Sequence, residues 1–189
     1  MKTTHLFILF CIVVCIQLFI PAQMIWDQES ILTSGTKFKF KTRPIDPSDP
    51  FRGKYIHLNY ELNRAKVKDT TMVTGDRIYV YFRKDANGFA QLDGISKELL
   101  KTEKEYVITF VNYVIEDVIH FRLPFESFYM EESKAKEAEI ATQRFNRNDS
   151  LTNVYAEVYI KNGNSVLQNV FINEMPLQQY VEKQRLLSE

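Results

Sequence analysis

The stretch from residue 43 to residue 60, RPIDPSDPFRGKYIHLNY, constrains the fold more than any other part of this chain. Its three prolines, between residues 44 and 50, fix φ and remove backbone donors, which excludes a helix or a central strand there. Gly53 then permits a backbone conformation or a close approach that a side chain would block. After this glycine, apolar and polar residues alternate, which predicts a half-buried strand from Tyr55 to Leu62. The side chains expected on its apolar face are Ile56, Leu58, Tyr60 and Leu62.

A second constraint is the apolar N-terminal segment, His5–Trp26. About 20 helical residues cross a hydrocarbon core of roughly 30 Å, so this segment is long enough to span a membrane. Lys2 precedes it, and Asp27 and Glu29 follow it, a charge order that favours the N-terminus inside and the rest of the chain outside. We therefore expect residues 1–26 to be an uncleaved anchor that contacts membrane lipid. A cleaved signal peptide is the alternative.

The rest of the chain is expected to form one β-rich domain, residues 36–189, after a linker or a short first strand at residues 27–35. Two Asn-Gly pairs, at residues 87–88 and 162–163, lie between alternating runs, and such turns are strong hairpin signals. We expect strands at residues 37–41, 55–62, 77–84, 89–92, 106–115, 119–125, 154–161 and 166–172.

One segment of this domain has the composition of a longer helix. Residues 131–144 are rich in Glu, Lys and Ala and contain no Gly or Pro, which predicts a surface helix. Residues 126–130 are expected to lead into it, residues 63–74 to form a variable loop, and Pro176 to open a last polar helix or tail. The predicted fold class is therefore α+β: a mostly antiparallel β domain with one surface helix, preceded by a transmembrane helix.

Composition argues against several functional classes. Lys plus Arg and Asp plus Glu number 24 each, and no element shows the basic excess of a nucleic-acid binder. Three alternating lysines at residues 37–41 are interpreted as a solvated strand face, the alternative being a strip for anionic lipid or nucleic acid. Both cysteines, Cys11 and Cys15, lie in the apolar segment, and the three histidines are scattered. We therefore expect no disulfide in the domain, no metal site and no cofactor.

Candidate catalytic groups are few. Asp46 and Asp49 could act as an acid and base pair, but Asp-Pro is first a turn signal. His57 and Glu61 share a strand face, which fits a site or a solvent-exposed sheet face equally well. Ser34 lies in a context weakly similar to the membrane-anchored signal peptidases, which use a Ser–Lys pair, but their Ser-Met sequence is missing. We predict no catalytic residue, and the sequence leaves enzyme activity open while favouring a non-catalytic role.

Residues 53–60, GKYIHLNY, resemble the signature of the GDYXXLXY family of bacterial membrane-anchored proteins. Gly, Tyr, Leu and Tyr match, whereas Lys54 stands where the family usually has Asp. Other parts of the chain are also similar to the family: the N-terminal apolar segment, residues 75–80, residues 125–129 and the closing hairpin at residues 154–172. The resemblance therefore covers nearly the whole chain. The motif or possible partner-binding residues that it implies are Asp46, Asp49, Arg52, Gly53, Lys54, Tyr55, His57, Leu58 and Tyr60.

The resemblance carries expectations about location and partners. The family has no established activity, and its members are often encoded beside multi-span membrane proteins. It implies a single-pass protein of the cell membrane with a periplasmic C-terminal domain. We expect an interaction or accessory module of a membrane protein complex, with a multi-span membrane protein as partner and no nucleic acid. The alternative is an envelope hydrolase or ligand-binding enzyme that uses the segment Asp46–Glu61, although Lys54 removes the carboxylate expected after the glycine.

Overall fold

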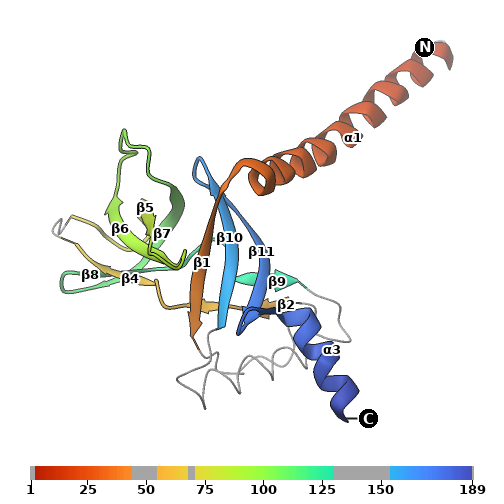
Figure 1. Ribbon diagram of the computed structural model, residues 1–189. Helices are drawn as coiled ribbons and strands as arrows, with labels where there is room; N and C mark the ends of the chain where they lie inside the picture. The colour runs from red at the N-terminus through yellow and green to blue at the C-terminus, as the bar shows by residue number, and fades with distance from the viewer. Residues whose placement is uncertain (1–2, 44–54, 68–70, 130–153, 189) are drawn as a thin grey trace.

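The computed structural model describes residues 3–43, 55–67, 71–129 and 154–188 of the 189-residue chain (Figure 1). These residues form an N-terminal helix, a domain of antiparallel strands and a short C-terminal helix, which confirms the predicted α+β class. The predicted surface helix at 131–144 lies outside the described residues.

Helix α1 (Thr3–Ser34) reaches away from the domain (Figure 1). None of its residues is buried, and both cysteines are exposed on it. The helix is long and apolar enough to cross a membrane, a description that also fits a signal sequence. Residues 27–34, expected as a linker or a short strand, continue the helix, because no Gly or Pro interrupts them.

The first sheet has five strands in the order β12-β11-β10-β1-β3, and every neighbouring pair is antiparallel. Its strands are β1 (Thr36–Arg43), β3 (Asn59–Tyr60), β10 (Val154–Lys161), β11 (Asn164–Ile172) and β12 (Met175–Pro176). The turn between β10 and β11 contains Asn162 and Gly163, whose φ values of 51° and 83° are those of a tight hairpin. Helix α3 (Leu177–Ser188) follows β12 and buries Leu177 and Val181, so the predicted C-terminal segment is a helix.

The second sheet also has five strands, in the order β4-β8-β7-β5-β6. Its strands are β4 (Arg64–Lys66), β5 (Arg77–Lys84), β6 (Ala90–Ser96), β7 (Tyr106–Ile115) and β8 (Val118–Phe121). The turn between β5 and β6 is held by Asp85, whose Oδ1 accepts the backbone N–H groups of Asn87 at 2.9 Å and Phe89 at 2.8 Å. Two short strands, β2 (Tyr55–His57) and β9 (Ser127–Tyr129), pair separately.

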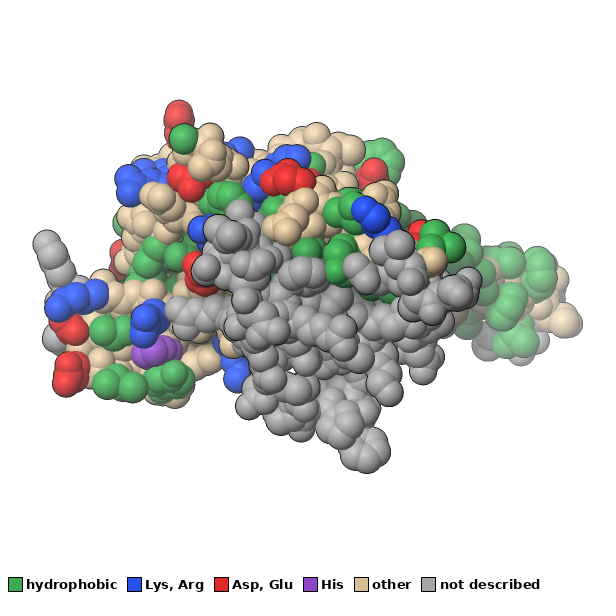
Figure 2. Space-filling model, turned by 60° about the horizontal axis from the view of Figure 1, so that its bottom comes forward, with side chains coloured by type: hydrophobic (Ala, Val, Ile, Leu, Met, Phe, Trp, Pro, Cys, Tyr) green, Lys and Arg blue, Asp and Glu red, His purple; other side chains and the backbone are tan. Residues whose placement is uncertain are grey.

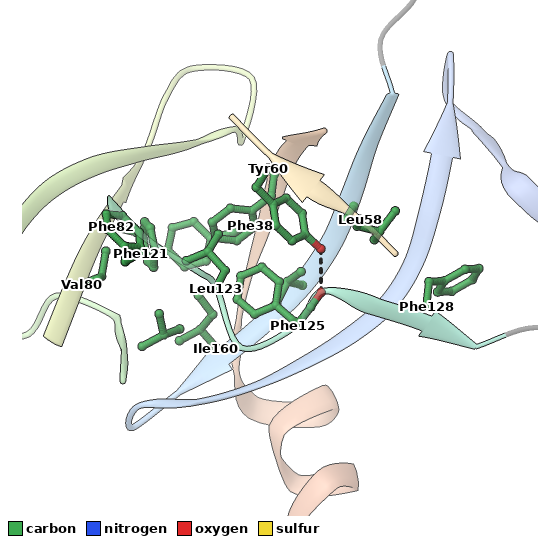
Figure 3. Close-up of a cluster of buried hydrophobic side chains, with 14 of the residues drawn as sticks. Phe38, Leu58, Tyr60, Val80, Phe82, Phe121, Leu123, Phe125, Phe128 and Ile160 are labelled. Carbon is green, nitrogen blue, oxygen red and sulfur yellow. Dashed lines mark hydrogen bonds between the residues drawn. The ribbon is translucent and has the colours of Figure 1, made fainter. Parts of the chain in front are cut away.

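One hydrophobic core joins the two larger sheets (Figure 3). Phe38 and Phe40 of β1 point inward, as the alternation predicts, and their rings lie 6.2 Å and 5.2 Å from the ring of Phe82 on β5. Aromatic rings at such distances add favourable edge-to-face contacts to the burial of apolar area. The β-rich domain is therefore held by packing between the sheets.

Other local expectations also differ from the structure. The predicted strand Tyr55–Leu62 is divided, because β2 pairs with β9 whereas β3 pairs with β1. Residues 64–66, expected in a loop, form strand β4 against β8, and residues 127–129, expected to lead into a helix, form strand β9. Each of these short strands is stabilised by pairing with a segment that is distant in the sequence. Such pairing cannot be predicted from the local sequence pattern.

Candidate functional site

The described part of the family-like signature, residues 55–60, connects separate sheets of the fold. His57 in β2 pairs with Ser127 of β9, and Asn59 in β3 pairs with Arg43 of β1. Between them, the backbone N–H of Leu58 donates to the carbonyl of Glu126 at 2.6 Å. The signature strand is therefore the point at which the first sheet, the β2–β9 pair and the chain leading into β4 come together.

Tyr60 anchors this segment in the core (Figure 3). Only 3% of the residue is exposed, and its hydroxyl donates to the carbonyl of Phe125 at 2.8 Å. Its ring also packs against Phe125 and Phe40, with centroids 5.2 Å and 5.9 Å away. Burial, with a smaller contribution from the charge of Glu126, raises the pKa of Tyr60 well above its ordinary value. The tyrosine therefore stays neutral and has a structural role.

A pocket of about 220 Å³ opens beside the polar face of the signature. We call it the signature pocket. It lies where β2 and β3, the end of β8 and the segment after β8 meet β7. The polar side chains that line it are His57, Asn59, Asn63, Asn112, His120, Arg122 and Glu126. Histidine surface is visible in Figure 2 among basic and hydrophobic side chains, at the end of the domain remote from the apolar helix.

A bulge in the second sheet and an adjacent aromatic pair form one wall of the pocket. The register between β7 and β8 shifts between Val111 and Tyr113, which leaves Asn112 as the extra residue of a bulge. A bulge redirects side chains, and here Asn112 reaches the pocket. Next to it, the rings of Tyr113 and His120 stack with centroids 4.3 Å apart. The wall therefore combines an amide with an aromatic pair.

Charge in the pocket is balanced between one acid and its basic neighbours. The Glu126 carboxylate Oε2 lies 3.9 Å from His57 Nε2. Burial raises the pKa of Glu126 above its usual value, while His57 and Arg122 act in the opposite direction. Among the described lining residues Glu126 is the single carboxylate, so the pocket is better equipped for hydrogen bonding than for acid–base catalysis by paired carboxylates.

The residues predicted from the signature fall into three groups. His57 and Tyr60 line the pocket, and Leu58 is buried in the core beside it. Tyr55 pairs with Tyr129 in the β2–β9 ladder. Asp46, Asp49, Arg52, Gly53 and Lys54 lie outside the described residues. Glu61, which shares the polar strand face in the sequence pattern, is exposed and does not line the pocket.

Sequence reasoning missed the part of the pocket that comes from distant segments. The residues missed are Asn63, which follows the signature closely, and Asn112, His120, Arg122 and Glu126, which lie far from it in the sequence. One signal was present: Asn112 interrupts the alternation of an otherwise apolar and aromatic strand, which is typical of a bulge.

The structure also bears on whether Ser34 belongs to a catalytic Ser–Lys pair like that of the signal peptidases. Lys161 Nζ donates to Ser34 Oγ at 2.6 Å and to Ser30 Oγ at 2.9 Å, while the Ser34 hydroxyl donates to the Ser30 carbonyl. The lysine acts as a hydrogen-bond donor to both hydroxyls, so the serine is not positioned to give its proton to the amine. A cation at the C-terminal end of a helix is favourable. We interpret this contact as the attachment of α1 to strand β10.

Within the described ranges, no group of three or more His, Cys, Asp or Glu side chains is arranged to hold a metal ion. Comparison with protein families gives one finding: the model of the family described as GDYXXLXY protein matches residues 17–170, most of the chain. Neither the curated proteins nor the solved structures include a match to this chain.

Proposed function

Because the chain belongs to the GDYXXLXY family, we propose that it is a single-pass membrane protein whose β-rich domain is an interaction module of a membrane protein complex. The domain lies on the extracytoplasmic side of the membrane. Its partner is a multi-span membrane protein, whose apolar surface is continuous with the bilayer.

The observation that carries this proposal is the uncovered surface of α1. Most of its apolar side chains from Leu6 to Trp26 are exposed, and none of them is buried. An apolar surface of this length is unfavourable in water, and membrane lipid or a neighbouring apolar helix would cover it. The helix therefore supports an anchoring role.

The junction between helix and domain supports a fixed orientation of the domain. Strand β1 begins at Thr36, one residue after Gly35, whose N–H donates to the carbonyl of Ile31 at 2.8 Å. A Cβ at Gly35 would lie 2.4 Å from that carbonyl oxygen and 3.1 Å from the carbonyl oxygen of Ile160, so the backbones are closely packed. Together with the Lys161 hydrogen bonds, this packing leaves no flexible linker. Such a domain presents the same face to its neighbours in the membrane.

The outer face of β7 is the best candidate for that contact. Phe110 and Ile115 are 57% and 56% exposed, and Tyr113 lies between them on the same strand. Exposed apolar groups gathered on one strand are typical of protein interaction surfaces. We call Phe110, Tyr113 and Ile115 the β7 face.

Site-specific photo-crosslinking tests the proposal. A photoreactive phenylalanine analogue replaces Phe110 in the full-length protein expressed in membranes, and a matched control replaces Leu99, which is 53% exposed in the loop after β6. We expect position 110 to give one discrete crosslinked product containing a multi-span membrane protein, and position 99 to give none. Absence of a product from all three positions of the β7 face would contradict the interaction role.

A second candidate function is ligand binding, and the signature pocket favours it. The sequence also left open an envelope hydrolase. That function has less support, since the described residues that line the pocket supply one carboxylate. Substitution of His57 by Ala separates the two functions. A module whose partner binds at the β7 face would keep its crosslink at position 110, whereas a pocket ligand would lose affinity.

A further inference from the structure

A groove lies between the domain end of α1 and the β10–β11 hairpin, which are side by side (Figure 1). Its volume of about 550 Å³ is within the range of small-ligand sites, about 300 to 1,000 Å³. We call it the junction groove. The lining residues used below are Met24, Asp27 and Ile31 of the helix and Lys161, Asn162 and Asn164 of the hairpin.

The junction groove lies at the depth of the lipid headgroups when α1 spans a membrane. The apolar segment of α1 ends at Trp26, and the helix rises about 6 Å from Asp27 to Ile31 at about 1.5 Å per residue. Each headgroup layer is about 5 to 8 Å thick, since a bilayer of about 40 to 45 Å has a hydrocarbon core of about 30 Å. The helical wall of the groove therefore spans this layer.

The groove carries one cation and one anion. Lys161 Nζ donates to Ser30 Oγ and Ser34 Oγ, and these two bonds use two of the three donors of an ammonium group. Asp27 lies one helical turn before Ser30, a spacing that places two side chains about 5 to 6 Å apart on one face of a helix. Asp27 is exposed and Lys161 is partly exposed, and neither forms an ion pair within the described residues. A ligand can therefore reach both charges.

A matching ligand carries an anion and an ammonium group a short distance apart. Its phosphate oxygens would accept from Lys161 and from the carboxamides of Asn162 and Asn164, which are both exposed. Its ammonium would donate to the Asp27 carboxylate. An ethanolamine phospholipid has both groups, separated by two carbons, and its acyl chains would continue into the membrane beside Met24.

Other common headgroups fit the groove less well. A headgroup that is only anionic can bind Lys161, but its charge is repelled by Asp27. A choline headgroup carries a positive charge but has no N–H group to donate to the carboxylate. Ethanolamine avoids both conflicts.

We propose that the junction groove binds the headgroup of a phosphatidylethanolamine molecule in the leaflet that faces the domain. The bound lipid fills the angle between helix and hairpin, where Lys161 already attaches the two elements. This inference rests on the proposed membrane anchor, because a headgroup reaches the groove only when α1 spans the bilayer.

The fluorescence of Trp26 measures this lipid selection. Trp26 is the single tryptophan of the chain, is 77% exposed and directly precedes Asp27. Full-length protein is reconstituted in phosphatidylcholine vesicles that contain an equal fraction of brominated phosphatidylethanolamine, phosphatidylcholine or phosphatidylglycerol, whose bromine atoms quench tryptophan. We expect phosphatidylethanolamine to bind beside Trp26 about threefold more strongly than the other two lipids, the effect of one exposed charge pair.

Two variants with matched controls place the preference in the groove. Asp27→Asn should reduce the preference for ethanolamine over choline to about one, whereas Glu29→Gln, on the same helix but outside the groove lining, should leave it unchanged. Lys161→Met should weaken the binding of phosphatidylethanolamine and phosphatidylglycerol alike, with Lys66→Met as its control. Because Lys161 also attaches α1, Asp27→Asn is the decisive variant: no hydrogen bond between described side chains depends on Asp27.

The possible outcomes separate this site from the anchor. Equal quenching by the three lipids, stronger quenching by phosphatidylglycerol, or a preference that survives Asp27→Asn would overturn the lipid site and leave the anchor intact. Quenching by none of the lipids, with protein that does not float with the vesicles, would contradict both. Excess soluble phosphoethanolamine should leave the preference unchanged, since a lipid in the same membrane has a much higher effective concentration. Loss of the preference would instead identify a soluble compound as the ligand and overturn the lipid assignment.

Discussion

At the scale of single residues, Tyr60 shows how the signature contributes to the fold. Its hydroxyl bond to Phe125 and its ring contacts connect β3 to the segment that ends at β9. Leu58, two residues earlier, is also buried. His57 and Asn59, which alternate with these core residues, line the signature pocket. The segment from β2 to β3 therefore contributes alternate residues to the core and to the pocket.

Tyr60→Phe tests the structural role of the tyrosine. The variant keeps the ring but leaves the Phe125 carbonyl without its donor, so unfolding should require about 1 kcal/mol less free energy. Urea unfolding of the detergent-solubilised protein, followed by circular dichroism, measures this change. Tyr113→Phe, at a half-exposed position, serves as the control and should change stability little. Equal effects from the two variants would contradict a special role for Tyr60.

Tyr155 predicts how stability depends on alkaline pH. Burial, helped by the charges of Glu174 and Glu157, raises its pKa from 10.0 to about 12. The folded state therefore holds the phenol proton more tightly than the unfolded state. This stabilisation is complete below pH 10 and is lost as the pH rises from 10 towards 12, an effect of about 2 kcal/mol.

Tyr155→Phe checks this pH dependence. The variant keeps the ring stacked on Phe171, at 5.2 Å, but has no proton to lose. Its free energy of unfolding, measured by urea titration at several pH values, should fall less steeply than that of the parent protein between pH 10 and 12. Parallel curves for the two proteins would show that Tyr155 does not cause the loss.

At the scale of secondary-structure elements, the sequence predicts elements that depend on neighbouring residues better than elements that depend on residues far along the chain. The hairpins β5–β6 and β10–β11 are predicted because their Asn-Gly turns and alternating strands lie in adjacent residues. Strands β4 and β9 are not predicted, since each depends on a partner far along the chain. The signature pocket is predicted only in part for the same reason: His57 was found, whereas Asn112 and Glu126 reach it through sheet pairing.

The turns of the β10–β11 and β5–β6 hairpins offer a matched pair of glycine substitutions, at Gly163 and Gly88. Gly163 and Gly88 have φ values of 83° and 82°, but a Cβ at Gly163 would lie 2.7 Å from Tyr106 Cε2, whereas nothing lies within 4 Å at Gly88. Both Ala variants carry the strain of the left-handed conformation, about 1 kcal/mol, and Gly163→Ala adds a clash. We expect losses of about 1 kcal/mol for Gly88→Ala and about 2 to 3 kcal/mol for Gly163→Ala, measured by urea unfolding. A larger loss at Gly88 would contradict the close packing of the hairpin on β7.

Lys161 tests the attachment of α1 to the first sheet. Lys161→Met removes both hydrogen bonds to the serines of the last helical turns, so hydrogen exchange of the backbone amides at residues 31–35 should become about tenfold faster. Lys66→Met is the control, because it breaks an exposed ion pair with Asp117 remote from the helix. Unchanged exchange at residues 31–35 would mean that other contacts hold the junction.

At the scale of the whole molecule, the helix and the domain form one continuous unit. The apolar part of α1 is uncovered, its polar end is attached to β10, and β1 starts directly after it. This continuity favours a domain held close to the membrane surface in one orientation. The β7 face and the signature pocket, which share Tyr113, then offer adjoining surfaces for the proposed membrane partner and for a soluble group.

Protease protection in oriented membrane vesicles tests this anchoring most directly. The full-length protein carries a different tag at each end, and the vesicles are washed with alkaline carbonate before digestion. We predict that the protein remains in the membrane at full length, that the C-terminal domain is digested only in right-side-out vesicles, and that the N-terminal tag is removed only in inside-out vesicles. A shortened protein released by carbonate, or a domain digested only in inside-out vesicles, would contradict a single-pass anchor with an extracytoplasmic domain.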